Sequence, residues 1–239
     1  VLRVTETKEA DKILTVLTPD MGKIPLIARG ARRKNSRIAA ACQLLAYSEL
    51  TLYRRGSWFL LDEASTVELF DGVRRDIVLL ALASYFAELT EAVCPEETAA
   101  PELLSLLLNA LYALCYLDRE ARLVKAAFQL RLLALAGFEP LASSCAVCGR
   151  PEPEAPMLDV VHGVVHCGGC KRQGGLSMPL TAAGLAALRH ILYCDSKKLY
   201  SFTLEETALR ELDHAGEAFA ASQLERSFRT LDYYKALLG

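Results

Sequence analysis

The sequence predicts an α+β fold: an N-terminal OB-fold β-barrel, followed by a helical bundle domain with an inserted four-cysteine ribbon. Three features of the chain support this prediction. Five short segments with strand character fill residues 1–70. From Asp76 onward, apolar residues recur at the spacing of amphipathic helices. Two C-x2-C pairs then interrupt the helical part, with eighteen residues between them.

The N-terminal strands are defined by apolar runs and by the turns between them. A turn at residues 19–22 (PDMG) separates the second predicted strand from the third. Gly56 marks the turn between the fourth predicted strand and the fifth. The predicted strands cover residues 2–5, 12–18, 23–28, 44–53 and 58–61. The OB-fold is the commonest barrel of this size that binds single strands. The pattern alone also allows an SH3-like barrel.

The helical part is predicted from apolar residues that share one helix face. Pro101 is expected in the first turn of one helix, Gly137 at the end of another, and Thr181 as the cap of a third. The predicted helices cover residues 77–89, 101–114 and 119–136, a segment after Thr181, and residues 203–238. The predicted domains are residues 1–75 (barrel), 76–142 and 177–239 (one helical bundle in two parts) and 143–176 (ribbon).

The four cysteines of the ribbon are spaced as metal ligands. Each C-x2-C pair can place two sulfurs on one metal, and two pairs complete a tetrahedral four-sulfur site that suits Zn²⁺. Short strands at residues 157–161 and 164–166, around a turn at residues 162–163, make the unit a zinc ribbon. Four protein ligands leave no position for a substrate water, so one structural zinc is expected. The predicted ligands are Cys145, Cys148, Cys167 and Cys170.

Two other uses of these residues stay open on the sequence alone. Cys145 and Cys148 would also suit a redox dithiol, and a site in which His162 or His166 replaces a cysteine is a further alternative. The remaining cysteines are scattered in apolar segments, which argues against a disulfide framework and for a reducing, cytosolic compartment. They are Cys42, Cys94, Cys115 and Cys194.

The composition is that of a globular protein with a well-filled core. The chain has 239 residues, of which 52% are hydrophobic and 23% charged. No apolar run reaches the roughly 18 residues of a membrane span, and the chain opens on a strand-like segment in place of a signal peptide. The net charge of −2 divides into +3 over residues 1–76 and −5 over the rest. The predicted barrel is therefore the basic part.

A short basic segment follows the third predicted strand. It places five positive charges within nine residues, among glycine, asparagine and serine residues typical of a loop. Such a segment can neutralise phosphates and release counterions from a nucleic acid, although charge alone gives an ordinary solvated loop equal weight. The predicted nucleic-acid-binding residues are Arg29, Arg32, Arg33, Lys34 and Arg37, with Lys12 and Lys23 as neighbours on the barrel.

Aromatic residues accompany the basic segment. OB-folds bind single strands with a positive groove and with aromatic rings on which bases stack. Four aromatic residues lie on neighbouring predicted strands: Tyr47, Tyr53, Trp58 and Phe59. For each of them core packing is favoured over stacking, most strongly for Trp58. Two further basic stripes fit solvated helix faces: Arg119, Arg122 and Lys125, and Arg226 with Arg229.

Signatures of catalysis are absent from the sequence. It contains no G-x-x-x-x-G-K-[ST] phosphate loop and no G-x-S-x-G nucleophile elbow. A zinc deaminase needs an H-x-E motif upstream of its C-x-x-C, and no histidine here supplies one. Catalysis is therefore not expected, and no catalytic residue is assigned.

Several segments together resemble the RecO family of bacterial DNA repair and recombination mediators. The resemblance spans nearly the whole chain, and its segments follow one another in the order expected in that family. The last of them is less basic than is usual there. The matching segments are EADKILT (9–15), ARGARR (28–33), RG (55–56), FQLRLL (128–133), GFEPL (137–141) leading into CAVCG (145–149), and ERSFRTL (225–231).

The resemblance implies a cytoplasmic, nucleoid-associated protein that binds single- and double-stranded DNA and anneals complementary strands. The strands include those coated by single-stranded DNA-binding protein, and with RecR the protein would help to load RecA. The resemblance also implies that the leucine-rich helical region holds an apolar pocket, with Lys or Arg nearby, for the acidic C-terminal tail of single-stranded DNA-binding protein. Some members lack the cysteines, so zinc is not essential to the shared activity.

Two other functions stay open on the sequence alone. The main alternative is a zinc-ribbon interaction or scaffold protein in which the basic segment is incidental, and salt-dependent DNA binding distinguishes the two. A thiol redox enzyme that uses Cys145 and Cys148 is the other. Stoichiometric zinc on all four thiolates would exclude it, because metal-bound thiolates are not free to exchange.

Overall fold

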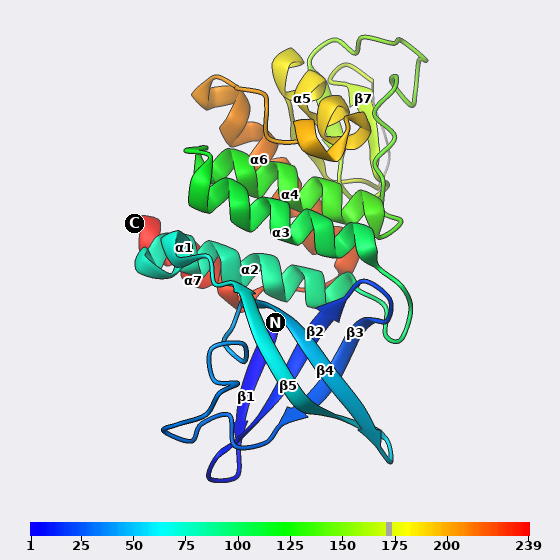
Figure 1. The fold of residues 1–239 in the computed structure, drawn as a ribbon. Helices are drawn as coiled ribbons and strands as arrows, with labels where there is room; N and C mark the ends of the chain where they lie inside the picture. The colour runs from blue at the N-terminus through cyan, green and yellow to red at the C-terminus, as the bar shows by residue number, and fades with distance from the viewer. Residues whose placement is uncertain (171–173) are drawn as a thin grey trace. The chain divides into compact units, whose positions relative to one another are not determined.

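The computed structural model describes residues 1–170 and 174–239 (Figure 1). By packing, the chain divides into two compact units. The first comprises Val1–Tyr116 and Phe228–Gly239, and the second comprises Leu117–Ser227. The first unit contains the N-terminal sheet and the basic segment, and the second contains the four cysteines. Packing therefore divides the chain at other positions than the predicted domains, which follow sequence pattern alone.

A five-stranded sheet forms the N-terminal part of the first unit (Figure 1). Its order is β1-β2-β3-β5-β4, and neighbouring strands are antiparallel except for the parallel pair β3 and β5. Hydrogen bonds between Val1 and the backbone of Leu45 and Ala46 bring the two edges of the sheet together. The five predicted strands are confirmed, and their assignment to an OB-fold stays a prediction. The strands are β1 (Arg3–Thr7), β2 (Asp11–Thr18), β3 (Gly22–Ala28), β4 (Tyr47–Arg55) and β5 (Trp58–Glu68).

Alternating apolar residues build the core of this sheet. On β2 and β3, the side chains of Leu14, Val16, Ile24 and Leu26 are all buried. The register pairs Leu14 with Leu26 and Val16 with Ile24. Side chains directly opposite each other in an antiparallel pair lie on the same face, so these four residues form one apolar layer.

The turn between β2 and β3 requires glycine. Gly22 has a φ of +57°, and a Cβ at this position would lie 2.3 Å from the carbonyl oxygen of Thr98 and 2.6 Å from that of Pro95. Lys23 also donates from its backbone to the Pro95 oxygen at 3.0 Å. The turn therefore holds the backbone of the loop at residues 95–98 in close contact.

Helices complete the first unit. The Asp76 side chain caps one of them by accepting hydrogen bonds from the backbone of the second and third residues after it. The last helix packs against α2, where the rings of Tyr85 and Phe228 meet edge to face at 5.6 Å and Glu88 accepts hydrogen bonds from Thr230. These helices are α1 (Asp71–Arg75), α2 (Ile77–Val93), α3 (Pro101–Tyr116) and α7 (Arg229–Leu238).

The helical stretch predicted over residues 203–238 is divided into two helices. The chain forms α6 (Glu206–Leu224) and then a separate α7, which belongs to the first unit. Glu225 ends α6 in a left-handed conformation with a φ of 49°. Glycine is the usual residue at such a position, and residues 224–228 contain neither glycine nor proline, so the sequence gives no mark of the break.

The second unit is built around three helices. α4 packs against α5 and α6, which confirms that helices from either side of the ribbon pack together. The predicted cap is also confirmed, because the Thr181 side chain accepts a hydrogen bond from the backbone of Gly184. The helical segments are α4 (Ala121–Leu135), α5 (Ala182–Tyr193), the short 3-10 turn η1 (Ser196–Lys198) and α6. Across both units, no helix in the described residues has the length and apolarity needed to cross a membrane.

Candidate metal centre and nucleic-acid interface

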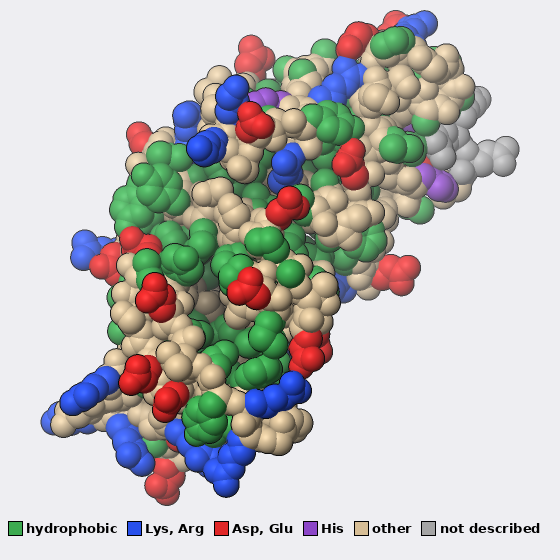
Figure 2. Space-filling view, turned by 45° about the vertical axis from the view of Figure 1, so that its right-hand side comes forward, with side chains coloured by type: hydrophobic (Ala, Val, Ile, Leu, Met, Phe, Trp, Pro, Cys, Tyr) green, Lys and Arg blue, Asp and Glu red, His purple; other side chains and the backbone are tan. Residues whose placement is uncertain are grey.

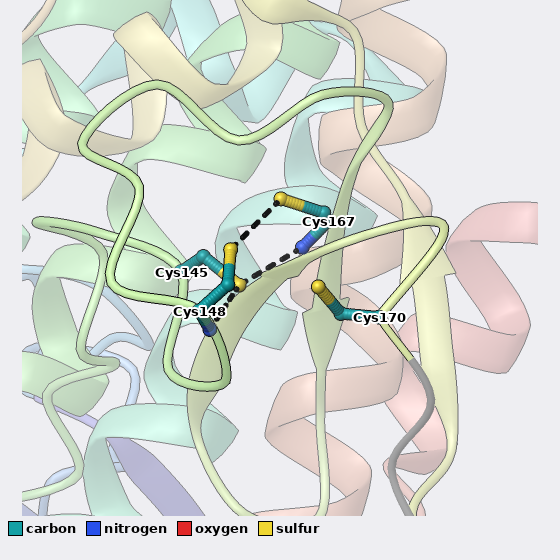
Figure 3. Close-up of side chains that lie close together, drawn as sticks. All are labelled: Cys145, Cys148, Cys167 and Cys170. Carbon is teal, nitrogen blue, oxygen red and sulfur yellow. Dashed lines mark hydrogen bonds between the residues drawn. The ribbon is translucent and has the colours of Figure 1, made fainter.

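The four cysteines converge beside a small sheet in the second unit (Figure 3). Cys145 and Cys148 come from the loop before this sheet, Cys167 ends its strand β7, and Cys170 follows in the next turn. Their sulfur atoms all lie within 4.8 Å of one another, so the structure brings together the four predicted ligands. The sheet has the order β7-β6-β8, with β6 (Pro156–Asp159), β7 (Val164–Cys167) and β8 (Ser177–Pro179).

The spacing of the sulfurs fits one four-coordinate metal ion. A tetrahedral ion with metal–sulfur bonds of about 2.3 Å holds its ligands about 3.8 Å apart. The sulfurs of Cys148 and Cys167 lie 3.8 Å apart. Four sulfur ligands suit a soft or borderline ion, whereas Mg²⁺ and Ca²⁺ prefer oxygen ligands. The cluster is therefore able to hold a metal ion, and its donors match those of structural zinc sites.

The ionisation of the cysteines also fits a metal site. The backbone N–H groups of Val147, Cys148 and Cys167 donate to the Cys145 sulfur at 3.4, 3.5 and 3.4 Å. Burial opposes ionisation of this thiol, but the backbone bonds outweigh it and lower the pKa of Cys145 to about 5. Hydrogen bonding with Cys148, together with burial and the charge of Cys145, raises the pKa of Cys170 to about 12. A cation bound at this position would favour the thiolate form of the cysteines that coordinate it.

The two histidines near the cluster are bonded to other groups. Nδ1 of His162 lies 2.7 Å from the fully buried carboxylate of Asp159. Nδ1 of His166 lies 2.8 Å from the carbonyl oxygen of Cys167, and its Nε2 lies 2.8 Å from the hydroxyl of Ser177. These bonds disfavour the alternative in which a histidine replaces one of the cysteines.

Arg189 on α5 fixes the loop that carries the first cysteine pair. Its guanidinium donates to the carbonyl oxygens of Ala142 at 2.8 Å, Ser143 at 3.1 Å and Pro151 at 2.6 Å. It also pairs with Glu152 at 2.7 Å. Sequence reasoning misses this residue because most of its partners are backbone atoms, which leave no trace in residue type.

The basic segment forms an exposed loop between β3 and β4 in the first unit. Two hydrogen bonds hold this loop against the turn between β1 and β2. The backbone N–H of Gly30 donates to the Asp11 carboxylate at 2.8 Å, and the backbone N–H of Arg32 donates to the carbonyl oxygen of Ala10 at 3.0 Å. The Arg32 side chain also pairs with Glu6 at 3.0 Å. The structure thus brings all five predicted cations into one loop, each exposed: Arg29, Arg32, Arg33, Lys34 and Arg37.

The two predicted neighbouring lysines lie at opposite ends of the same strand pair. Lys12 is opposite Ala28, directly before the basic loop. Lys23 is opposite Leu17, five residues further along the ladder, and it donates to the backbone oxygen of Glu91 at 3.0 Å. Five residues of strand span roughly 17 Å. The structure therefore brings Lys12 to the basic loop but keeps Lys23 away from it.

The prediction that Trp58 packs in the core is wrong. Trp58 is 42% exposed and Tyr53 is 45% exposed, whereas Phe59 packs against the core of the sheet. Trp58 is the first residue of β5, and strand alternation turns the next side chain inward in its place. Arg54 lies over the Phe59 ring, 5.3 Å from its centroid. Arg55, also on β4, is an exposed cation to which sequence reasoning gave no role.

Lys and Arg side chains gather over the N-terminal sheet on the face shown in Figure 2, toward the bottom of that view. They are interspersed with a few acidic side chains and with apolar ones. A surface of this kind suits a polyanion whose phosphates are met by separate cations.

An apolar pocket of about 370 Å³ lies in the first unit between the sheet and α3. The helix contributes four leucines of the predicted leucine-rich region: Leu104, Leu107, Leu108 and Leu111. Among the described residues that line it, Asp20 is the one charged side chain, and neither Lys nor Arg is present. The pocket therefore supplies the apolar half of the predicted peptide site without the cation that a terminal carboxylate needs.

The basic stripe predicted near α4 does not form one exposed face. Arg122 pairs with Glu206, and Lys125 is buried against Asp213 and Glu217. Lys125 is 2% exposed, so it is held by helix packing and is not presented to a ligand. Arg119 is the member of the stripe that stays exposed.

Comparison with known proteins matches nearly the whole length of the chain. Residues 1–70 match the family model described as Recombination protein O N terminal, and residues 74–232 match Recombination protein O C terminal. Two proteins named DNA repair protein RecO, from Acetivibrio thermocellus and Symbiobacterium thermophilum, are 30% and 32% identical, and each alignment covers 99% of this chain and 94% or 95% of the relative. A third, from Heliobacterium modesticaldum, is 36% identical over 89% of this chain and 78% of its own length.

Proposed function

The chain belongs to the RecO family of DNA repair proteins, and from this membership we propose that it is a recombination mediator. It binds DNA, anneals complementary single strands and, with RecR, helps to load RecA onto strands coated by single-stranded DNA-binding protein. It works in the bacterial cytoplasm, at the nucleoid. The activity involves no nucleotide hydrolysis, and no residue is assigned to catalysis.

The observation that carries this proposal is the exposed basic loop within the region that matches the N-terminal family model. Annealing brings two polyanions together, so their charge must be neutralised before the bases pair. Five exposed cations in one loop, fixed by backbone hydrogen bonds, supply that charge without a cofactor. Arg29, Arg33, Lys34 and Arg37, with Arg32 and Lys12, are the proposed DNA contacts.

An annealing assay tests this function. Complementary oligonucleotides that carry a fluorophore and a quencher are mixed with the protein, either bare or coated with single-stranded DNA-binding protein. We expect annealing faster than the spontaneous rate in both cases, with a rate that falls as salt rises. An unchanged rate, together with salt-independent or undetectable DNA binding, would favour the alternative of a zinc-ribbon scaffold protein.

We further propose that the cysteine cluster holds one structural Zn²⁺. Elemental analysis of purified protein should find one zinc per chain, and Cys148→Ser should remove most of it, because the cluster loses a ligand. Cys194→Ser is the matched control: this cysteine lies outside the cluster and should leave the zinc content unchanged. Full zinc retention after replacement of both Cys145 and Cys148 would contradict the assignment.

The acidic tail of single-stranded DNA-binding protein is a proposed partner, and the pocket beneath α3 is the place proposed for its apolar side chains. A labelled tail peptide should raise fluorescence anisotropy at micromolar protein, and Leu108→Asp should weaken that binding by placing a charge in the pocket. A peptide that binds the variant as well as the wild type would show that the tail binds elsewhere. No anisotropy change with wild type would remove the tail from the list of partners.

A further inference from the structure

We propose that the outward face of the β4–β5 hairpin is a stacking site for unpaired nucleobases. Tyr53 and Trp58 supply the rings and Arg55 supplies a phosphate contact; these three residues are called the hairpin face below. The proposal rests on the proposed DNA-binding function and specifies the state of the DNA that this surface takes, which is unpaired and not duplex.

The register of the hairpin places the three side chains on one face. Arg55 is directly opposite Trp58, and Tyr53 is directly opposite Leu60. Residues opposite each other share a face, as do residues two apart along a strand. Tyr53 and Trp58 are therefore diagonal neighbours, at a spacing of about 7–8 Å that aromatic rings can bridge.

Most of the packing of this hairpin is on its other face, although Leu60, which shares a face with Tyr53 and Trp58, is also buried. Leu52, Phe59 and Leu61 belong to the core of the sheet or pack against it. Tyr53 and Trp58 instead keep 45% and 42% of their surfaces exposed. Burial of a large ring is strongly favourable, so two adjacent rings held in water by a well-paired ladder indicate a binding surface.

Arg55 supplies a cation on the hairpin face. Its neighbour Arg54 points to the other side, where it lies over the Phe59 ring and pairs with Glu97 at 3.7 Å. Arg55 is exposed and lies opposite Trp58. Rings flanked by cations are the arrangement with which proteins hold single strands independently of sequence.

An unpaired strand is the partner that this chemistry favours. In a duplex both faces of each base are covered by its neighbours, so a protein ring can stack only on a base that has left the stack. Aromatic and arginine residues also suit protein partners. The five exposed cations of the basic loop, in the same unit, favour a polyanion over a protein.

Trp58 allows a direct test, because it is the one tryptophan in the chain. Titration with oligo(dT) should quench its fluorescence over the same concentrations at which the anisotropy of a labelled strand rises. A duplex of equal length should bind with little quenching, since its bases cannot stack on the ring.

Substitutions complete the test. The double change Tyr53→Ala and Trp58→Ala should weaken single-strand binding by about tenfold or more, with the duplex affinity unchanged. Tyr53→Phe with Trp58→Phe keeps both rings and should bind single strands within about twofold of wild type. Tyr193→Ala is the control: it removes an aromatic side chain that is 59% exposed in the other unit, and the affinities for single strands and for duplex should both stay unchanged. The double alanine variant should remain folded by circular dichroism, with some loss of stability to urea, because more than half of each ring's surface is covered.

The outcomes separate this site from the function on which it rests. If the wild type binds no DNA, the proposed function itself fails. If the wild type binds single strands but the double alanine variant binds them equally well, or Trp58 is not quenched, the stacking site is overturned while DNA binding stands. If the double alanine variant loses binding to single-stranded DNA-binding protein but keeps its affinity for single-stranded DNA, the hairpin face is a protein-docking surface. That result would also overturn the proposal.

Discussion

At the scale of single residues, the cations of the basic loop divide into two kinds. Arg32 pairs with Glu6, and its backbone is bonded to Ala10, so it helps to fix the loop against the β1–β2 turn. Arg33, Lys34 and Arg37 form no ion pair within the described residues and are exposed. Among the described residues, these three side chains can therefore meet phosphates without breaking an ion pair.

Replacing Arg33, Lys34 and Arg37 together by alanine should weaken single-strand binding uniformly across sequences. Each lost phosphate contact removes about 0.7 from the slope of log K against log salt, so the slope should flatten by about 2. Exposed loop substitutions change stability by less than about 0.5 kcal/mol, so folding should be unaffected. Affinity measured at several salt concentrations checks this.

The matched control is Lys197→Ala with Lys198→Ala, which removes exposed charge from the second unit. That variant should keep the wild-type slope. If the triple variant also keeps the wild-type slope, the DNA surface lies elsewhere, for example at Arg226 or Arg229. The basic loop would then be an ordinary solvent-exposed loop.

Two glycines with similar backbone conformations should respond very differently to substitution. Gly22 and Gly56 have φ of +57° and +63°, but a Cβ would overlap backbone oxygens at Gly22 and meet nothing within 4 Å at Gly56. Gly56→Ala should cost about 1–2 kcal/mol, the strain of the left-handed conformation alone. Gly22→Ala should cost clearly more, because the backbone must also shift. Urea unfolding compares the two, and equal losses would contradict the close contact.

At the scale of elements, α4 and α6 are joined by charges within an apolar core. Lys125 and Asp213 are 2% and 6% exposed, and Lys125 contacts Glu217 as well. Burial raises the pKa of Asp213 to about 6 despite the lysine beside it, and one of its carboxylate oxygens has no hydrogen-bond partner within the described residues. The ammonium is therefore what makes two buried carboxylates tolerable between these helices.

Lys125→Met should destabilise the protein by about 3–5 kcal/mol near pH 8, because two buried carboxylates lose their cation. Asp213 has a folded pKa above the unfolded value of about 3.9, so its burial penalty grows as pH rises from about 4 through 6 and is constant above that. Removing Lys125 raises the folded pKa further. The deficit should therefore be smaller at pH 5 than at pH 8, as urea unfolding at the two pH values can measure.

Arg122→Met is the control for this prediction. Its guanidinium pairs with Glu206 across the same two helices but is 34% exposed. A partly exposed pair of this kind contributes less than about 1 kcal/mol. Arg122 also lowers the pKa of Asp213, but less than Lys125 does, so the loss of Arg122 should widen the difference between pH 5 and pH 8 by a smaller amount. A Lys125→Met loss as small as that of Arg122→Met would contradict the account of the buried charges.

How far the sequence predicts these elements depends on whether the determining contacts are local. The first three strands and the four-cysteine cluster follow from alternation and spacing, which act within a few residues. The exposure of Trp58 depends on the register in which β5 pairs with β4. A shift of that register by one residue would turn the Trp58 side chain to the buried face. The break at Glu225 depends on a left-handed residue that is not glycine, stabilised by the packing of α7 on α2. Register and packing are long-range, and no local pattern records them.

At the scale of the whole molecule, the proposed metal and the proposed DNA contacts belong to different compact units. The cysteines lie within Leu117–Ser227, whereas the basic loop and the hairpin face lie within Val1–Tyr116. The family models divide the chain near residue 70, but packing places α2, α3 and α7 with the N-terminal sheet. This division predicts that the metal stabilises one unit without being needed for DNA contact in the other.

Removing the metal should loosen the second unit and leave the first intact. The cluster holds the loop of the first cysteine pair to β7, and Arg189 connects the same loop to α5. After chelation, amide hydrogen exchange should rise in β6, β7 and the first turns of α5. It should stay unchanged in β2 and β3, whose core residues belong to the other unit.

The affinity for single strands should survive chelation within about twofold, since the phosphate and base contacts are not in the unit that loosens. Cys194→Ser protein, treated in the same way, should behave as the wild type does. If β2 and β3 lose protection together with β6 and β7, the two units unfold as one, and the metal supports the DNA-binding sheet as well as the ribbon.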